Sequence, residues 1–189
     1  MKELRLYLEQ ILPLSEEEWQ RFSSLFSEAK LEKGDYFAMD KRMETRIGFL
    51  LNGVVRAFYR SHNGIEYNKT FFTDNEFFGP YAALVTRQVN HINIQALTEC
   101  TILTAPYSQV TELFPLYRKM ETLARLIAEQ FYIEKEKREI ELVLLQADER
   151  YDLFKKEHPS IENLIPQYHI ASYLGITPTQ LSRIRAKKT

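Results

Sequence analysis

The stretch PQYHIASYLGITPTQLSRIR, residues 166–185, sets the pattern of the C-terminal part of the chain. Pro166 suits the start of a helix, where its missing N–H costs nothing, and Gly175 can supply the positive φ that ends that helix. Thr177 then suits the N-cap of a second helix, and Pro178 suits its first position. This order of residues predicts two short helices joined by a tight turn, which is the arrangement of a helix-turn-helix.

The apolar positions of the same stretch fit two helices that pack on one core. Ile170 and Leu174 lie four residues apart, and Leu181 and Ile184 lie three apart, so each pair falls on one helix face. The N-terminal part of the second helix of a helix-turn-helix enters the major groove and reads base edges. Arg183 could make a bidentate contact to guanine, and Gln180 could pair with adenine. The base-reading candidates are Thr179, Gln180, Ser182 and Arg183.

Charge is distributed unevenly along the chain. Residues 163–189 contain no Asp or Glu and four basic residues, so they carry +4, and the remaining 162 residues carry −5 (−1 minus +4). A cationic end gives a neutral chain a place to meet a polyanion. A solvated basic tail, or a helix hairpin with a structural role only, is the alternative. The phosphate-contact candidates are Gln167, Tyr168, Thr177, Arg185, Lys187 and Lys188.

The region before this basic end changes from β to α texture. Turn signals in residues 31–106 separate short runs rich in Phe, Tyr, Ile, Val and Thr, which predicts an antiparallel sandwich or barrel. Asn63-Gly64 is the strongest hairpin signal in the chain. Two short helices are expected before it, the second with a capping box formed by Ser15 and Glu18.

A long helix is expected between the two parts, because residues 116–145 contain neither Gly nor Pro. At 1.5 Å per residue, about 30 residues span about 45 Å. An apolar stripe at nearly coiled-coil spacing predicts homodimerisation through this helix, with an intramolecular brace as the alternative. The stripe consists of Met120, Leu123, Ile127 and Phe131. Three parts are therefore predicted: a β domain at 1–114, a dimerisation helix at 115–145 and a DNA-binding domain at 146–189.

Several classes of protein are disfavoured by composition. Cys100 is the lone cysteine, which excludes a disulfide framework and a four-cysteine cluster and fits a reducing cytosol. The N-terminus lacks an uninterrupted apolar run and no stretch of 18 apolar residues occurs, so we expect a cytoplasmic protein with no membrane partner. A cupin-like metalloenzyme is the rival for the β domain, but only His62 and His91 fall there. With no Gly-x-Ser-x-Gly motif either, we predict no enzyme and no metal.

Together these segments resemble the Crp/Fnr family of bacterial transcription regulators over nearly the whole chain. The resemblance implies an α+β fold: an N-terminal double-stranded β-helix (a jelly roll like that of cyclic-nucleotide-binding domains), a long dimerisation helix and a C-terminal winged helix-turn-helix. Because the chain stops at Thr189, the wing is expected to be truncated. The segments that carry the resemblance are residues 34–35, 49–56, 77–79, 147–151, 170–177 and 181–184.

The resemblance also implies a function and its partners. It implies a homodimer that binds double-stranded DNA, with RNA polymerase as a candidate partner. Arg183 matches the family's base-reading arginine, whereas Thr179 stands where a base-reading glutamate is usual, so we expect a half-site different from the family's best-known one. We interpret the chain as a sequence-specific DNA-binding transcription regulator. The alternative is an effector-sensing or interaction module of the same fold that has lost DNA binding.

The effector pocket implied by the resemblance departs from the cyclic-nucleotide pattern. Gly79 is followed by Pro80 where a glutamate would hold the ribose, and Asn90 and His91 stand where an Arg-Ser pair would hold the phosphate. A buried phosphate without a fixed cation loses its hydration uncompensated, and only Arg87 lies close by in sequence. We therefore predict no cyclic AMP binding and no cofactor; the aromatic residues are either pocket lining or barrel core. The pocket candidates are Phe72, Phe78, Gly79, Tyr81, Arg87, Asn90 and His91.

Overall fold

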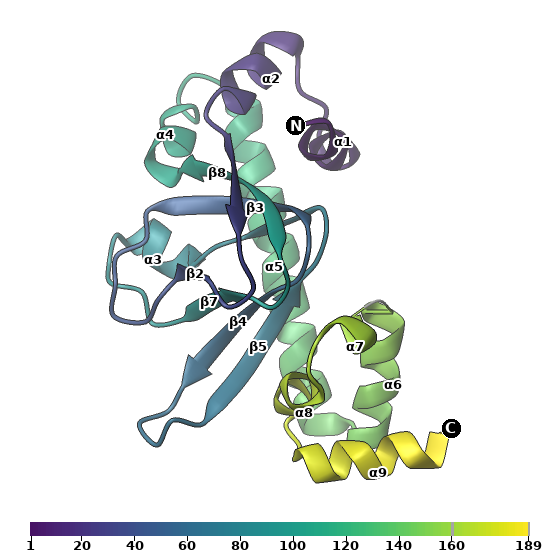
Figure 1. Ribbon diagram of the computed structural model, residues 1–189. Helices are drawn as coiled ribbons and strands as arrows, with labels where there is room; N and C mark the ends of the chain where they lie inside the picture. Colours follow the sequence, from purple (N-terminus) through teal and green to yellow (C-terminus); the bar gives the residue numbers. More distant parts are fainter. Residues whose placement is uncertain (160, 189) are drawn as a thin grey trace.

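The structure, a computed structural model, describes residues 1–159 and 161–188. Its N-terminal part is a β-roll made of two four-stranded antiparallel sheets (Figure 1). The strands of the first sheet, in spatial order, are β1 (Ser27–Leu31), β8 (Cys100–Pro106), β3 (Arg46–Asn52) and β6 (Glu76–Phe78). The strands of the second are β2 (Tyr36–Ala38), β7 (Asn93–Ala96), β4 (Val55–Arg60) and β5 (Glu66–Phe72).

The space between the sheets is filled by aliphatic and aromatic side chains. Leu50, Val55 and Ile102 are buried in one cluster with Phe72 and Phe78. Close packing there requires a glycine at position 48, since a Cβ on Gly48 would lie 2.4 Å from the Phe78 ring. The interior of the roll is therefore a packed core.

The β4–β5 hairpin is the longest projection of the roll. Its strands pair from Val55 opposite Phe72 at the base to Arg60 opposite Glu66 near the turn, which confirms the hairpin predicted at Asn63-Gly64. In Figure 1 this hairpin extends from the roll toward the level of the C-terminal helices. β5 is the last strand of its sheet, so one side of its backbone has no strand partner.

Helices cover the other end of the roll. The capping box of Ser15 and Glu18 is present as predicted, and Leu4, Leu8 and Phe22 are buried against the first sheet. The helices are α1 (Lys2–Ile11), α2 (Glu16–Ser23), α3 (Tyr81–Thr86) and α4 (Tyr107–Glu112).

The long helix α5 (Arg118–Leu144) runs along the roll toward the C-terminal helices (Figure 1). Met120 and Leu123 are buried in the N-terminal core and Ile127 packs against it, so this part of the predicted dimerisation stripe faces the chain's own core. Phe131, further along, is 38% exposed. Met120, Leu123 and Ile127 therefore hold α5 against its own chain. Apolar side chains on the opposite face of α5 remain exposed.

Four helices complete the chain: α6 (Ala147–Glu157), α7 (Ile161–Leu164), α8 (Gln167–Leu174) and α9 (Pro178–Lys188). Their core contains Phe154, Ile170, Leu174 and Leu181, and it is continuous with Phe71 of the roll. Because 44 residues can hardly maintain a core alone, packing against the roll supplies apolar surface that these helices lack. No helix in the described ranges is long and apolar enough to cross a bilayer.

Candidate nucleic-acid interface

The helices α8 and α9 are joined by a short turn whose geometry follows from Gly175. Gly175 has a φ of 69°, the left-handed conformation that glycine adopts easily, and it is the C-cap of α8. The Ile176 amide donates to the Ala171 carbonyl at 3.0 Å, which closes the turn. Pro178 begins α9, as the sequence predicts.

The first turn of α9 is held by a capping box that uses two of the predicted DNA-contacting residues. The Gln180 amide donates to Thr177 Oγ1 at 3.2 Å, and the Thr177 amide donates to Gln180 Oε1 at 2.9 Å. The side-chain oxygen of Gln180 therefore caps the helix end, while the residue as a whole remains exposed to solvent. The Thr-x-x-Gln spacing is a known capping signal, so the sequence already contained this information.

One face of α9 is buried and the other is open to solvent. Leu181 is only 1% exposed, and Ile184 packs against the same core. All four base-reading candidates have exposed side chains: Thr179, Gln180, Ser182 and Arg183.

The basic phosphate candidates near the end of α9 are anchored to the neighbouring helices. Arg185 Nε lies 3.1 Å from a carboxylate oxygen of Glu162, and Lys188 contacts the carboxylate of Asp152 and donates to the Asp148 carbonyl at 3.2 Å. Lys187 is exposed. Exposed ion pairs contribute at most about 1 kcal/mol, so a phosphate group can compete for these side chains.

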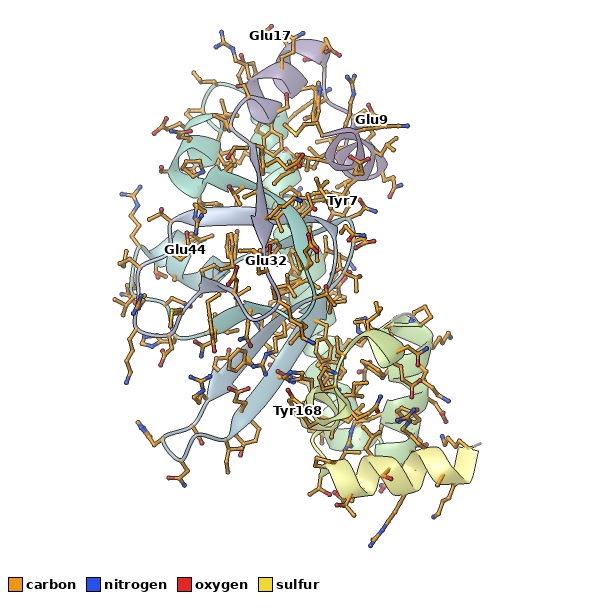
Figure 2. All side chains as sticks on the ribbon, viewed as in Figure 1. Tyr7, Glu9, Glu17, Glu32, Glu44 and Tyr168 are labelled. Atoms are coloured by element: carbon orange, nitrogen blue, oxygen red, sulfur yellow. The ribbon has the colours of Figure 1, made fainter. Side chains whose placement is uncertain are left out.

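The two remaining candidates lie on α8. Gln167 Nε2 donates to the Glu162 carbonyl at 3.0 Å, so its side chain supports the preceding turn. Tyr168 is exposed and lies near the boundary between the C-terminal helices and the hairpin (Figure 2). Glu9 and Glu17, on α1 and α2, lie at the opposite end of the molecule from α9.

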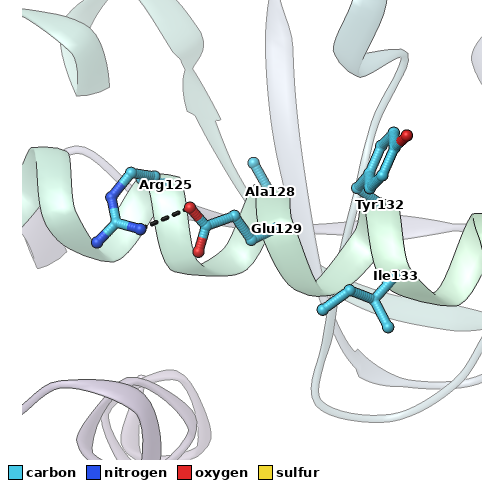
Figure 3. A pocket seen from close by; sticks show the side chains of 5 residues that line it. All are labelled: Arg125, Ala128, Glu129, Tyr132 and Ile133. Atoms are coloured by element: carbon cyan, nitrogen blue, oxygen red, sulfur yellow. Dashed lines mark hydrogen bonds and ion pairs between the residues drawn. The ribbon is translucent and has the colours of Figure 1, made fainter.

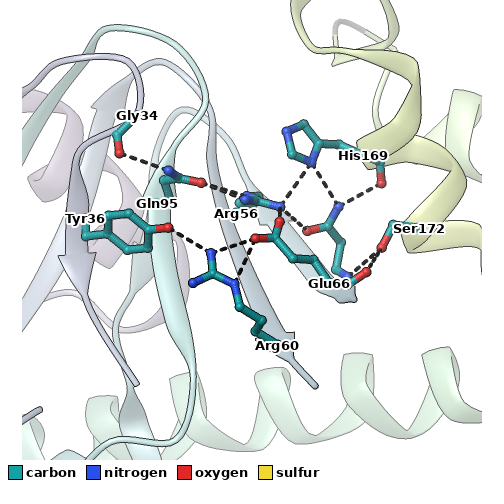
Figure 4. A network of polar contacts seen from close by, with 9 residues as sticks. Gly34, Tyr36, Arg56, Arg60, Glu66, Gln95, His169 and Ser172 are labelled. Atoms are coloured by element: carbon teal, nitrogen blue, oxygen red, sulfur yellow. Dashed lines mark hydrogen bonds and ion pairs between the residues drawn. The ribbon is translucent and has the colours of Figure 1, made fainter. Parts of the chain in front are cut away.

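A polar network that the sequence did not reveal joins α8 to the roll (Figure 4). Arg56, on β4, donates to Gln95 Oε1 at 2.7 Å, to Asn68 Oδ1 at 3.2 Å and to His169 Nδ1 at 3.1 Å, and it pairs with Glu66 at 2.7 Å. An arginine can only donate, so Nδ1 of His169 is the acceptor and its imidazole is neutral. Burial, and secondarily the Arg56 charge, lowers the pKa of His169 to about 4.

The seven candidates for an effector pocket lie in different environments. Phe72 and Phe78 are part of the roll core, and Gly79 precedes the turn into α3. Asn90 is buried, and its side chain bonds to the Met39 carbonyl and to the Ile92 backbone. Those facing solvent are Tyr81, Arg87 and His91. Of the three aromatic candidates, Phe72 and Phe78 therefore belong to the core and Tyr81 lies at the surface.

The outer face of α5 carries a shallow depression instead (Figure 3). All of its lining residues come from this one helix, and an Arg125–Glu129 ion pair borders it. The lining residues are Arg125, Ala128, Glu129, Tyr132 and Ile133. Among the residues that the structure describes, no group of three or more His, Cys, Asp or Glu side chains is placed to hold a metal ion.

Comparison with known proteins gives an independent view of this fold. Residues 28–116 match the cyclic nucleotide-binding domain family. No curated protein matches the sequence significantly. FixK2 from Bradyrhizobium japonicum is 16% identical, with a TM-score of 0.73 over 86% of this chain and 83% of that chain.

Two further solved structures are similar over most of both chains. CLP from Xanthomonas campestris, described as a c-di-GMP-responsive global regulator, is 14% identical, with a TM-score of 0.69 over 89% of this chain and 88% of that chain. A protein from Eubacterium rectale, described as a transcriptional regulator of the Crp/Fnr family, is 16% identical, with a TM-score of 0.74 over 99% and 87%. The predicted fold class is confirmed: the chain has a jelly-roll β domain, matched by the cyclic nucleotide-binding domain family over residues 28–116, with helices after it, and its fold is that of the Crp/Fnr-type regulator structures.

Proposed function

We propose that this protein is a sequence-specific, DNA-binding transcription regulator of the Crp/Fnr type. The observation that carries the proposal is that only one face of α9 is buried: Leu181 is anchored in the core while Thr179, Ser182 and Arg183 remain exposed. A helix held in this way from behind can enter the major groove and present its N-terminal residues to base edges. In this role α8 and α9 form the helix-turn-helix, and α9 is the recognition helix.

Electrostatics support DNA as the partner of α9. Residues 163–188 contain no Asp or Glu, and the acidic ends of α1 and α2 lie at the far end of the molecule. The exposed Arg183 and Lys187 of α9 therefore offer positive charge to an approaching phosphate backbone, which favours encounter in the right orientation.

The proposed regulator acts as a homodimer through the outer face of α5. Tyr132, Ile133, Ile140 and Val143 are all more than half exposed, and they recur at helical spacing opposite the buried Leu123. Two copies of this face can bury each other's apolar side chains. The pair would then place two recognition helices about 34 Å apart, on successive turns of a near-palindromic operator.

Selection of bound sequences from a random pool of double-stranded DNA tests the proposal. The purified protein is expected to enrich a palindromic consensus whose half-sites are centred about 10 base pairs apart. Enrichment of no sequence by a folded protein would refute sequence-specific binding. It would favour the alternative, an interaction module of the same fold. Against that alternative stands the polar, basic character of the exposed face of α9, because an interface for another protein is depleted of charge at its centre.

The regulator is further proposed not to respond to cyclic AMP. The side chain of Asn90 is engaged with backbone groups, and the core of the roll is packed with Phe72 and Phe78. Calorimetric titration with cyclic AMP is expected to give no binding heat, and the nucleotide is expected to leave DNA affinity unchanged; saturable binding would refute this part. The resemblance to Crp/Fnr regulators adds a cytoplasmic location and RNA polymerase as a candidate partner.

A further inference from the structure

The contact between α8 and the edge of the roll is unusual because one side chain serves two backbone groups. Ser172 Oγ accepts a hydrogen bond from the Asn68 amide at 3.0 Å and donates one to the Glu66 carbonyl at 2.8 Å (Figure 4). Both backbone groups belong to β5, the last strand of its sheet, and both point away from β4. The hydroxyl therefore takes the place of a neighbouring strand at this point of the sheet.

Buried hydrogen bonds beside Ser172 strengthen the contact between α8 and β5. Asn68 Nδ2 donates to the His169 carbonyl at 2.8 Å, one helical turn before Ser172, and the same Asn68 accepts from Arg56. Arg56, Asn68 and His169 are 4%, 6% and 5% exposed. Removing any one of these groups would leave a buried donor or acceptor without a partner, which makes partial separation costly.

Apolar packing joins the same two elements beside the polar network. The Phe71 ring, also on β5, lies 5.3 Å from the Tyr173 ring on α8 and 6.2 Å from the Phe154 ring on α6. From the other side, Arg138 of α5 stacks on Tyr173 with 3.9 Å between its guanidinium carbon and the ring centroid. Thus α8 is held by the hairpin, by α5 and by its own domain.

From these contacts we infer that Ser172 and Asn68 are positioning residues for DNA recognition. They dock the helix-turn-helix on the edge of β5, so that the roll sets the direction of α9 in each protomer. This inference rests on the proposed function. It differs from a purely stabilising role in one respect: docking matters when two recognition helices must meet two half-sites at once, and it does not matter for binding one half-site.

The docked arrangement leaves the exposed face of α9 accessible, so docking is expected to raise the affinity for the full operator. Thr179, Ser182 and Arg183 are exposed while Ser172 is bound to β5. Docking therefore preorganises the dimer for DNA. An undocked helix-turn-helix would sample many directions, and this would lower the effective concentration of the second recognition helix at its half-site.

The test combines Ser172→Ala with a partner variant on the roll, Asn68→Asp, which removes the donor to the His169 carbonyl and keeps the acceptor for Arg56. Ser172→Thr retains the hydroxyl and serves as the conservative variant. Ser108→Ala, on the exposed surface of α4, is the control for the loss of a serine hydroxyl. Each protein is measured for amide hydrogen exchange at position 68 without DNA, and for affinity to the full operator and to a single half-site.

Ser172→Ala and Asn68→Asp are expected to speed exchange at position 68 about tenfold, because the donor loses its partner or its docked helix. Both variants are expected to bind the full operator about tenfold more weakly and the single half-site as the parent does. Ser172→Thr and Ser108→Ala should behave like the parent.

Three results would overturn the positioning role: unchanged exchange at position 68, unchanged binding of the full operator, or equal losses on the full operator and the half-site, which would indicate a damaged helix-turn-helix. A parent protein that binds no DNA would refute the proposed function and this role together. The exchange measurement would still report the docking itself.

Discussion

Arg183 is the side chain whose replacement should change which DNA sequence is preferred. Arg183→Ala is expected to cost about 1–3 kcal/mol of binding free energy and to relax selectivity at one base pair, because the variant cannot make a bidentate contact to guanine. Lys187→Ala, one turn further on the exposed surface, is the matched control and should weaken all sequences alike. Affinity measurements on operators substituted at each position distinguish the two. If Arg183→Ala discriminates among these operators as the parent does, Arg183 does not read a base.

His169 gives the protein an acid-sensitive contact. Its pKa is about 4 in the folded chain, below the ordinary histidine value of 6.5, so the unfolded chain binds the proton first as the pH falls. Stability from this group is complete above pH 6.5 and is lost progressively between 6.5 and 4, by about 3 kcal/mol in total. His169→Asn, whose amide oxygen can replace Nδ1 as the acceptor for Arg56, should remove this pH dependence.

Urea unfolding at several pH values measures the effect. His62→Asn, on the exposed hairpin turn, is the control and should keep the slope of the parent. Groups that titrate elsewhere, such as Glu76, whose pKa burial raises to about 7, contribute equally to all three proteins and cancel. The same loss of stability in His169→Asn as in the parent would show that another group is responsible.

Single residues also show what a sequence can and cannot reveal about this site. The exposure of Arg183 followed from helical spacing within a dozen residues. The pairing of Arg56 with His169 joins positions 113 residues apart, and neither residue belongs to a local pattern that indicates the other. Gln180 is an intermediate case. Thr177, three residues before it, indicated a capping role, but Gln180 was instead predicted to read a base.

Among the elements, α5 shows that the spacing of apolar residues predicts a helix but not the partner of each face. The absence of Gly and Pro correctly predicted one long helix, but the apolar side chains lie on two opposite faces. Periodicity cannot say which face turns toward the roll, so Met120 and Leu123 were predicted at a dimer interface and are found in the core. The exposed face that remains is the one available to a second chain.

A charge on that outer face should prevent dimerisation without disturbing the fold. Ile140→Glu combined with Val143→Glu is expected to raise the dimer dissociation constant at least about tenfold, or about 1.4 kcal/mol, because two carboxylates would be buried without partners. Analytical ultracentrifugation measures the change. Leu116→Glu, at an exposed apolar residue before α5, should remain as dimeric as the parent. A double variant that stays fully dimeric would place the interface elsewhere.

For the whole molecule, the basic residues near the C-terminus predict how strongly the DNA-binding constant depends on salt concentration. Lys187, Arg185 and Lys188 give six phosphate contacts per dimer, so the logarithm of the binding constant should fall with the logarithm of salt concentration with a slope of about −5. Lys187→Ala removes two contacts and should bring the slope to about −4. A parent slope near −2 would mean that Arg185 and Lys188 stay in their ion pairs with Glu162 and Asp152 on DNA.

The sequence reading was most successful where the fold is built from local units. The β-roll, its hairpin, the long helix and the α8–α9 turn each depend on caps, turns or alternation within a few residues. The relation between the roll and the C-terminal helices depends instead on side chains that meet only after each part has folded. The surroundings of the pocket candidates could not be read from the sequence for a similar reason, since burial of Phe72 and exposure of Tyr81 follow from packing.

The hydroxyl of Ser172 has one more consequence, for colloidal behaviour. A terminal β-strand with unpaired N–H and C=O groups is a template on which another polypeptide can add a strand, and proteins commonly cover such strands. In this protein the cover is α8, the first helix of the proposed helix-turn-helix. Whenever α8 lifts from β5, the uncovered strand can recruit a second molecule, so we expect aggregation to begin from an otherwise folded chain and to be slowed by bound operator DNA.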